Sequence, residues 1–179
     1  MAEKLTERAC VTRRQFLLAS GGAAVTTGLL LSLPGLARAV PARMTRYPER
    51  RIAKLSQLKQ DVPIGFRYPF DDHLHSASFL VKLGIPAGGG VGREKDIVAF
   101  NSLCTHMGGP MMGAYKPEHK AVGPCPFHLT SFDLTKHGMV IAGHATESLP
   151  QVILEARGND IFAVGILGLV YGRYDNLRR

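Results

Sequence analysis

Short apolar runs alternate along the chain with polar segments rich in glycine and proline. Runs of this length, with β-branched and aromatic residues between turn residues, are typical of strands. No segment keeps a 3.6-residue apolar period over three turns, as an amphipathic helix would. The runs that predict strands are residues 62–70, 77–85, 96–103, 131–134, 139–143, 151–156 and 161–166. The pattern therefore predicts an all-β fold of short strands.

The segments between these runs read as loops and turns. Residues 86–95 (PAGGGVGREK) predict a hairpin loop, and residues 157–160 (RGND) predict a turn. The polar, basic segment 40–56 is expected to form an extended arm. A length of 179 residues with 20 Gly and 11 Pro suits one loop-rich domain. We expect an antiparallel β domain whose long loops gather at one end.

The net charge of +8 is spread along the chain without a long basic run. Residues 1–39 hold five basic and two acidic residues, a charge of +3, and the other 140 residues hold 17 basic and 12 acidic residues, a charge of +5. Nucleic-acid-binding proteins usually concentrate their charge in a patch or stripe. The charge therefore favours an ordinary solvated surface over a nucleic-acid interface.

The first 39 residues have the pattern of a signal peptide. A charged start is followed by 15–37, which contains no charged residue, and by the A-x-A-like cleavage site at Ala37–Ala39. The pair Arg13-Arg14 resembles the twin-arginine (Tat) signal of bacteria, a route that exports folded proteins, often with cofactors. We expect a twin-arginine signal peptide over 1–39 and a mature periplasmic domain over 40–179. An ordinary secretory signal or a retained membrane anchor is the alternative.

The mature chain keeps two cysteines, and each is followed closely by a histidine. Cys104 and His106 form a C-x-H pair, and Cys125 and His128 form a C-x-x-H pair 18 residues further on. An exported domain with two cysteines can join them in a disulfide, and one tetrahedral zinc could also use this set. A mixed pair from each of two loops suits a two-iron centre, with both thiolates on one iron and both imidazoles on the other.

These two boxes, C-T-H-x-G and C-P-x-H, resemble the signature of the Rieske [2Fe-2S] family over about residues 96–165. The resemblance implies a Rieske-like antiparallel β domain with an inserted cluster-binding subdomain at about 103–146. It also implies that Cys104 and Cys125 hold the inner iron of one [2Fe-2S] cluster, and that His106 and His128 hold the outer iron near the surface.

Four positions near the boxes bear on the cluster's properties. Rieske proteins of cytochrome bc complexes carry one further cysteine in each box, and these form a disulfide; here Gly109 and Phe127 stand in their places. Those relatives also place a serine and a tyrosine where this chain has Thr130 and Phe132. Thr130 can still donate a hydrogen bond to the cluster, whereas Phe132 cannot. We therefore predict a lower midpoint potential than in bc-type relatives.

These departures, the leader and the tail at 168–177 (GLVYGRYDNL) resemble the small subunit of the bacterial arsenite oxidase family. That resemblance implies a molybdopterin-containing large subunit as partner and a periplasmic cytochrome c or azurin-like blue copper protein as electron acceptor. It implies an electron-transfer subunit of an oxidoreductase complex, with no catalytic residue or substrate site on this chain. The alternatives are the Rieske subunit of a quinol-oxidising bc-type complex and a non-redox secreted β domain with zinc or a disulfide.

Other polar clusters carry less information. The segment 71–75 (DDHLH) has the composition of a metal site but also that of a polar turn. His119 and His137 stand beside lysines in polar loops and are expected to be solvated. His144 is not expected to bind metal because the four residues above already complete the ligand set.

Overall fold

The computed structural model of the chain forms two units, Met1–Met44 and Thr45–Arg179. The structure describes residues 46–71 and 74–177, so the account below concerns the second unit. The predicted signal peptide at 1–39 lies outside the described residues. None of the helices within the described ranges is long and apolar enough to cross a membrane.

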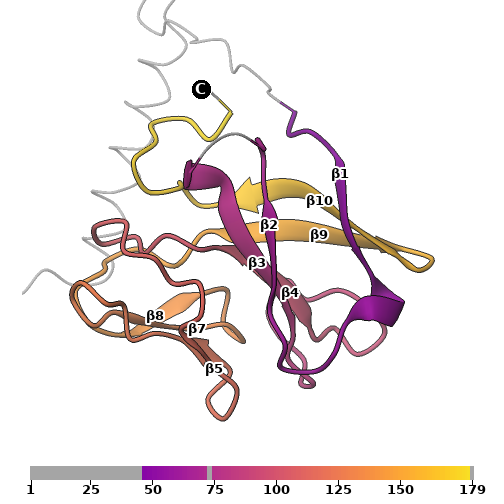
Figure 1. Cartoon of the computed structure of the whole chain (residues 1–179), viewed down its shortest axis with the longest axis horizontal. Helices are drawn as coiled ribbons and strands as arrows, with labels where there is room; N and C mark the ends of the chain where they lie inside the picture. The colour runs from indigo at the N-terminus through magenta and orange to yellow at the C-terminus, as the bar shows by residue number, and fades with distance from the viewer. Residues whose placement is uncertain (1–45, 72–73, 178–179) are drawn as a thin grey trace, which may run out of the picture. The chain divides into compact units, whose positions relative to one another are not determined.

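The second unit is built from two antiparallel sheets (Figure 1). The larger sheet has the strand order β1-β10-β9-β4-β3-β2, and the smaller has the order β5-β6-β7-β8. Two short 3₁₀ helices, η1 (Leu55–Gln57) and η2 (Leu74–Ser76), accompany the strands in the described part of the chain. The large-sheet strands are β1 (Arg50–Lys54), β2 (Ile64–Arg67), β3 (Ala77–Lys82), β4 (Ile97–Asn101), β9 (Gln151–Arg157) and β10 (Asp160–Leu167). The small-sheet strands are β5 (Tyr115–Lys116), β6 (Ala121–Val122), β7 (Ser131–Asp133) and β8 (Met139–Ala142).

The predicted all-β class is confirmed, and each predicted apolar run overlaps a strand. The predicted turn at 157–160 joins β9 to β10, which pair from Asp160↔Arg157 outward. The expected arm at 40–56 was wrong in part, because β1 lies within it and pairs with β10. β1 has a charged sequence because it is an edge strand, with partly exposed and exposed positions throughout. The two-residue strands β5 and β6 are too short to leave an apolar pattern.

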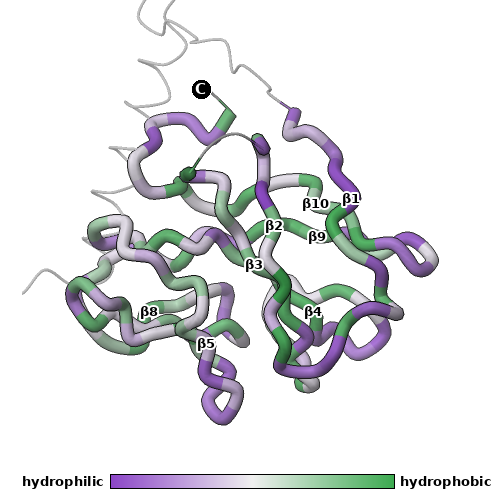
Figure 2. The backbone as a smooth tube through the Cα atoms, viewed as in Figure 1, coloured by the Kyte–Doolittle hydropathy of each residue, from purple (hydrophilic) through white to green (hydrophobic). Residues whose placement is uncertain are grey.

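The burial pattern of each strand depends on whether one or both faces of the sheet at that strand are packed against the core. All five residues of β4 are buried, since this strand lies between β3 and β9 and has core on both faces. β10 alternates buried and partly buried positions along most of its length. Figure 2 shows hydrophobic positions along β9 and β10 of the large sheet, whereas the edge strand β1 and the turn between β5 and β6 are largely hydrophilic.

One of the two hydrophobic clusters joins the sheets and includes two cysteines. It combines Phe79 and Phe100 from the large sheet, Phe132 from the small sheet, and Cys104 and Cys125 from the loops between strands. The second cluster lies within the large sheet and includes Leu80, Val152 and Ile161. The cysteine loops are therefore anchored in the core that connects the two sheets.

A polar contact also ties the small sheet to the large one. The Asp61 carboxylate, just before β2, accepts a hydrogen bond from the Tyr115 hydroxyl at 2.6 Å and contacts the Lys120 ammonium at 2.7 and 2.8 Å. Burial acts to raise the pKa of Asp61, but hydrogen bonds from Lys120, Tyr115 and Gln60 outweigh it and hold this pKa below its ordinary value. The contact of Asp61 with Lys120 and Tyr115 therefore stabilises the folded state when the Asp61 carboxylate is ionised, and less when it is protonated.

Asp61→Asn is expected to lower the free energy of unfolding by about 1 kcal/mol at pH 7, because a charge-assisted contact becomes a neutral one. Asp61 has a φ of +60°, in the left-handed region, which asparagine tolerates as well as aspartate does. The folded-state pKa of Asp61 lies below the unfolded one, so its contribution is full above about pH 4 and is lost as the pH falls through the folded pKa. Chemical denaturation at pH 7 and pH 3 measures both effects.

The matched control for this prediction is Asp160→Asn. Asp160 forms an exposed ion pair with Arg51 at 3.4 Å and should contribute little. Equal losses in the two variants at pH 7, or a loss for Asp61→Asn that is as large at pH 3 as at pH 7, would contradict the assigned role of Asp61.

Candidate metal centre

The first ligand box forms a tight loop directly after β4. The Cys104 N–H donates to the Gly109 carbonyl at 2.8 Å, and the Gly108 N–H donates to the Cys104 carbonyl at 2.8 Å. Gly108 has a φ of +68°, and a Cβ at this position would lie 2.5 Å from the Tyr171 ring of the C-terminal tail. Glycine is required here both by the backbone and by the ring that covers it.

The second ligand box, between β6 and β7, repeats the same hydrogen-bond pattern. The Cys125 N–H donates to the Thr130 carbonyl at 2.8 Å, and the Leu129 N–H donates to the Cys125 carbonyl at 2.9 Å. In both loops the cysteine is thus bonded to residues four and five positions later. Two equivalent loops from different parts of the chain present their cysteines to each other.

The structure brings the four predicted ligands together in two pairs. Cys104 and Cys125 are free thiols, each 1% exposed, and their side chains are within hydrogen-bond contact of each other. The rings of His106 and His128 lie 4.7 Å apart between centroids and nearly perpendicular, at 85°. His106 is half-buried and His128 is exposed. The sulfurs therefore lie inside and the imidazoles face outward, as the two-iron arrangement requires.

The surroundings of these pairs fit a bound cluster. The Nδ1 atom of His106 is buried and has no hydrogen-bond partner among the described residues, which is costly unless a ligand such as iron takes its lone pair. A Cβ on Gly109 would lie 2.5 Å from the Cys125 sulfur, so glycine leaves the space that the sulfur occupies. Within residues 46–71 and 74–177, no three His, Cys, Asp or Glu side chains form a site for a single metal ion.

Thr130 links the two cysteine loops through its hydroxyl. Its side chain is fully buried and accepts a hydrogen bond from the His144 N–H at 3.2 Å. Burial raises the pKa of the Cys104 thiol, and so does Cys125, whereas the His106 N–H and the Thr130 hydroxyl donate to the sulfur and act in the opposite direction. Thr130 therefore lies where the sequence predicted a donor to the sulfur, and metal binding must release protons from these thiols.

Gly109 and Phe127, which replace the disulfide cysteines of bc-type relatives, lie next to each other. A Cβ on Gly109 would be 3.2 Å from the Phe127 ring, which is 57% exposed and contacts the His128 ring edge-on. The phenyl ring thus occupies the place at the outer edge that a covalent link would otherwise take.

Phe132 is fully buried in the core cluster that contains both cysteines, and it has no hydroxyl to donate. Phe132→Tyr is expected to raise the midpoint potential by about 60 mV, because a hydrogen bond of about 1.4 kcal/mol would favour the more negative reduced state. Redox titration followed by EPR measures the shift. Phe127→Tyr, whose hydroxyl would face solvent, is the control with no expected shift. An unchanged or lower potential in Phe132→Tyr would disprove the assignment.

Three further histidines, His119, His137 and His144, differ in their surroundings. His119 is exposed in the turn between β5 and β6, as expected. His137 is also exposed, but its Nδ1 lies 2.7 Å from the Gln151 side-chain oxygen. His144 lies against the rings of both His106 and His128. Sequence reasoning missed this contact, for which a histidine directly after a glycine was the sole local signal.

The metal-like composition at 71–75 does not persist as a cluster in the described part of this segment. Asp71 pairs with Arg50, and the His75 ring lies close to Gly172 of the tail. Positions 72 and 73 lie outside the described residues.

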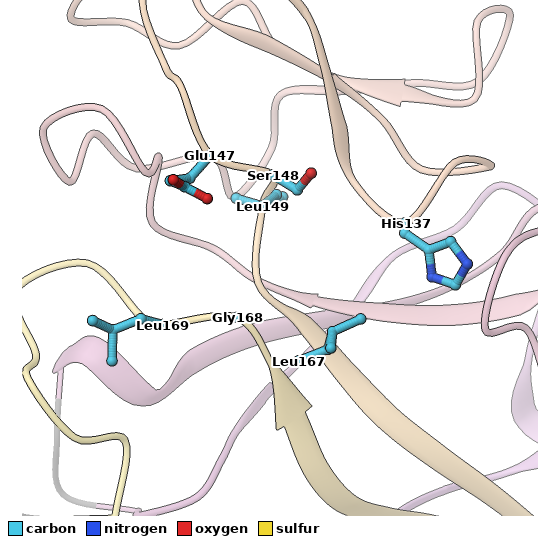
Figure 3. A pocket seen from close by; sticks show the side chains of 7 residues that line it. All are labelled: His137, Glu147, Ser148, Leu149, Leu167, Gly168 and Leu169. Carbon is cyan, nitrogen blue, oxygen red and sulfur yellow. The ribbon is translucent and has the colours of Figure 1, made fainter. Parts of the chain in front are cut away.

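A pocket of about 530 Å³ is lined by residues 147–149, by residues 167–169 and by His137 (Figure 3). Figure 3 shows Glu147, Ser148 and Leu149 facing Gly168 and Leu169 across it. The Thr105 hydroxyl, between Cys104 and His106 in the chain, donates to the Glu147 carbonyl at 2.8 Å. The ligand loop and the rim of the pocket are thus directly joined.

Two antiparallel sheets, paired cysteine loops and outward imidazoles define a Rieske-type iron–sulfur protein. The Rieske [2Fe-2S] domain family matches residues 73–153. The chain belongs to this family and carries one [2Fe-2S] cluster. This finding replaces the zinc and disulfide alternatives, and the two free cysteines agree with it.

Two relatives extend the similarity to almost the whole chain, and both are named iodate reductase subunit IdrB. The protein of Denitromonas iodatirespirans is 60% identical over 171 residues, covering 95% of this chain and 89% of that protein. The protein of Pseudomonas sp. (strain SCT) is 58% identical over 166 residues, covering 93% and 84%. Among solved structures, the soluble domain of the Rieske protein II (soxF) from Sulfolobus acidocaldarius has a TM-score of 0.62 and 24% identity. It covers 72% of this chain and 82% of that one, and it supports the fold alone.

Proposed function

We propose that this chain is the electron-transfer subunit of an iodate reductase in the periplasm. The observation that carries the proposal is 58–60% identity over nearly the whole chain to subunits of that name. Reduction of iodate consumes electrons, so the chain would deliver electrons to a catalytic partner. An arsenite oxidase subunit would carry them in the opposite direction, because arsenite oxidation releases electrons.

In this role Cys104, Cys125, His106 and His128 would hold the cluster, which supplies a one-electron redox centre when bound. The buried thiols would keep water away from the inner iron, and the imidazoles would hold the outer iron nearer the surface. Large apolar side chains in the two ligand loops are exposed around this edge: Met107 at 52%, Phe127 at 57% and Leu129 at 67%. Exposed apolar groups around a redox edge suit contact with a protein partner.

We further propose a molybdopterin-containing large subunit as the catalytic partner. A periplasmic cytochrome c or azurin-like copper protein would exchange electrons with the complex, as donor to an iodate reductase or as acceptor from an arsenite oxidase. The twin arginine Arg13-Arg14 supports export after the cluster is loaded. Replacement of both arginines with lysine should leave the precursor in the cytoplasm, and amino-terminal sequencing of the wild-type protein tests cleavage after Ala39.

Substrate direction is tested on the purified complex by following the cluster itself. Iodate added to the anaerobically reduced complex should remove the EPR signal of the reduced cluster within turnover time, and arsenite added to the oxidised complex should not create it. Reversal of these results would establish the arsenite oxidase alternative. The isolated chain is the control and should respond slowly or not at all to either oxyanion, because its proposed role includes no substrate site.

A further inference from the structure

A third imidazole stands beside the two predicted histidine ligands. The His144 ring lies 5.6 Å from the His106 ring, tilted by 31°, and 6.4 Å from the His128 ring, nearly perpendicular at 87°. His144 comes from the segment after β8, a third part of the chain that neither ligand box includes. The three rings therefore form one group at the outward edge of the site.

The backbone around His144 is built to hold it there. Its N–H donates to the Thr130 hydroxyl at 3.2 Å, and Thr130 in turn donates to the Cys104 sulfur. The preceding Gly143 has a φ of +96°, and a Cβ on it would lie 2.4 Å from the Thr130 Cα. Only glycine allows this close approach, so the loop that carries His144 is fixed against the second ligand box.

We propose that His144 is a positioning residue for the outer iron. It contacts both ligand imidazoles without replacing either, limits the orientations that their rings can adopt, and covers part of the edge from water. The proposal rests on the Rieske assignment and goes beyond it, because nothing in the ligand signature calls for a third histidine. Groups that contact metal ligands commonly orient them and tune the centre.

In this proposal His144 acts by packing its flat ring against the two ligand imidazoles. Two variants of His144 should therefore behave differently. His144→Ala removes the ring and should let the imidazoles of His106 and His128 take several orientations. His144→Phe keeps a flat ring of similar size and should preserve a single orientation. His119→Ala removes an exposed imidazole from the turn between β5 and β6 and is the matched control.

The experiment compares EPR line widths and ligand-nitrogen couplings of the dithionite-reduced proteins, together with iron content and the rate of iron loss to a chelator. We expect every variant to retain the couplings of two ligand nitrogens. His144→Ala should show broader lines and severalfold faster iron loss, and His144→Phe and His119→Ala should match the wild type.

Spectra and iron-loss rates for His144→Ala that coincide with the wild type would overturn the proposal. So would loss of one nitrogen coupling, which would make His144 a ligand, or broad lines in His144→Phe. If His144→Ala fails to load iron, His144→Phe alone decides: narrow lines support the packing role and broad lines refute it. A wild-type protein without a mixed Cys/His cluster signal would instead refute the ligand assignment itself.

Discussion

Serine in place of Cys125 is expected to yield a protein without its iron–sulfur cluster. The cysteine thiolate is the form that binds iron, and a serine hydroxyl ionises too weakly to replace it. Cys125 is 1% exposed and packs in the core that joins the two sheets. In small metal-held domains, metal binding supplies on the order of 10 kcal/mol of folding free energy. Loss of the cluster should therefore also lower the melting temperature of the domain.

Iron content, visible absorbance and thermal melting measure this outcome. His106→Ala should likewise abolish the native cluster signal, because its buried Nδ1 is predicted to bind the outer iron. The control is His119→Ala, whose exposed ring lies in the turn between β5 and β6 and should leave iron and stability unchanged. A Cys125→Ser protein that holds a full complement of iron and sulfide would refute the predicted ligand set.

Gly109→Ala is expected to have the second largest effect, although it adds a single methyl group. That methyl would stand 2.5 Å from the Cys125 sulfur and 3.2 Å from the Phe127 ring. Overpacking of this kind costs about 1–3 kcal/mol, and here it would displace a predicted ligand from the position that iron requires. We expect most of the iron to be lost and the melting temperature to fall.

Gly113→Ala is a matched control in the segment that follows. A Cβ at Gly113 meets nothing within 4 Å, and its φ of +86° makes alanine unfavourable by about 1–2 kcal/mol through the backbone alone. This control should lose some stability but keep its iron. Equal iron contents in the two variants would show that the Cys125 sulfur has room to move, contrary to our reading of the site.

Much of the fold could be predicted because strands bury alternate or continuous apolar residues. The runs at 96–103 and 151–156 correspond to β4 and β9, which lie side by side in the large sheet. β1 was missed because an edge strand needs few apolar residues, and its pairing with β10 joins segments more than 100 residues apart. Such a partner leaves no mark in the local sequence of β1.

The site also has a part that the sequence predicts and a part that it does not. Which side chains can bind iron is a property of the residue types, and Cys104, His106, Cys125 and His128 stood out because each pair lies close in the chain. The contact of His144 with two of these residues could not be read from spacing. It depends on Gly143 approaching Thr130, and these two residues meet only when β7 pairs with β8 and closes the hairpin between them.

By itself, the sequence determined the donor chemistry, the all-β class and the family, because these depend on side-chain type and local pattern. The tertiary structure alone decided which donors are buried, which face outward and which further residues touch them. The two sulfurs meet in the core because β4 and the small sheet pack together, and the imidazoles reach the surface because both loops turn outward in the same way. Burial and contact arise from residues distant in the chain, so only the folded arrangement could specify them.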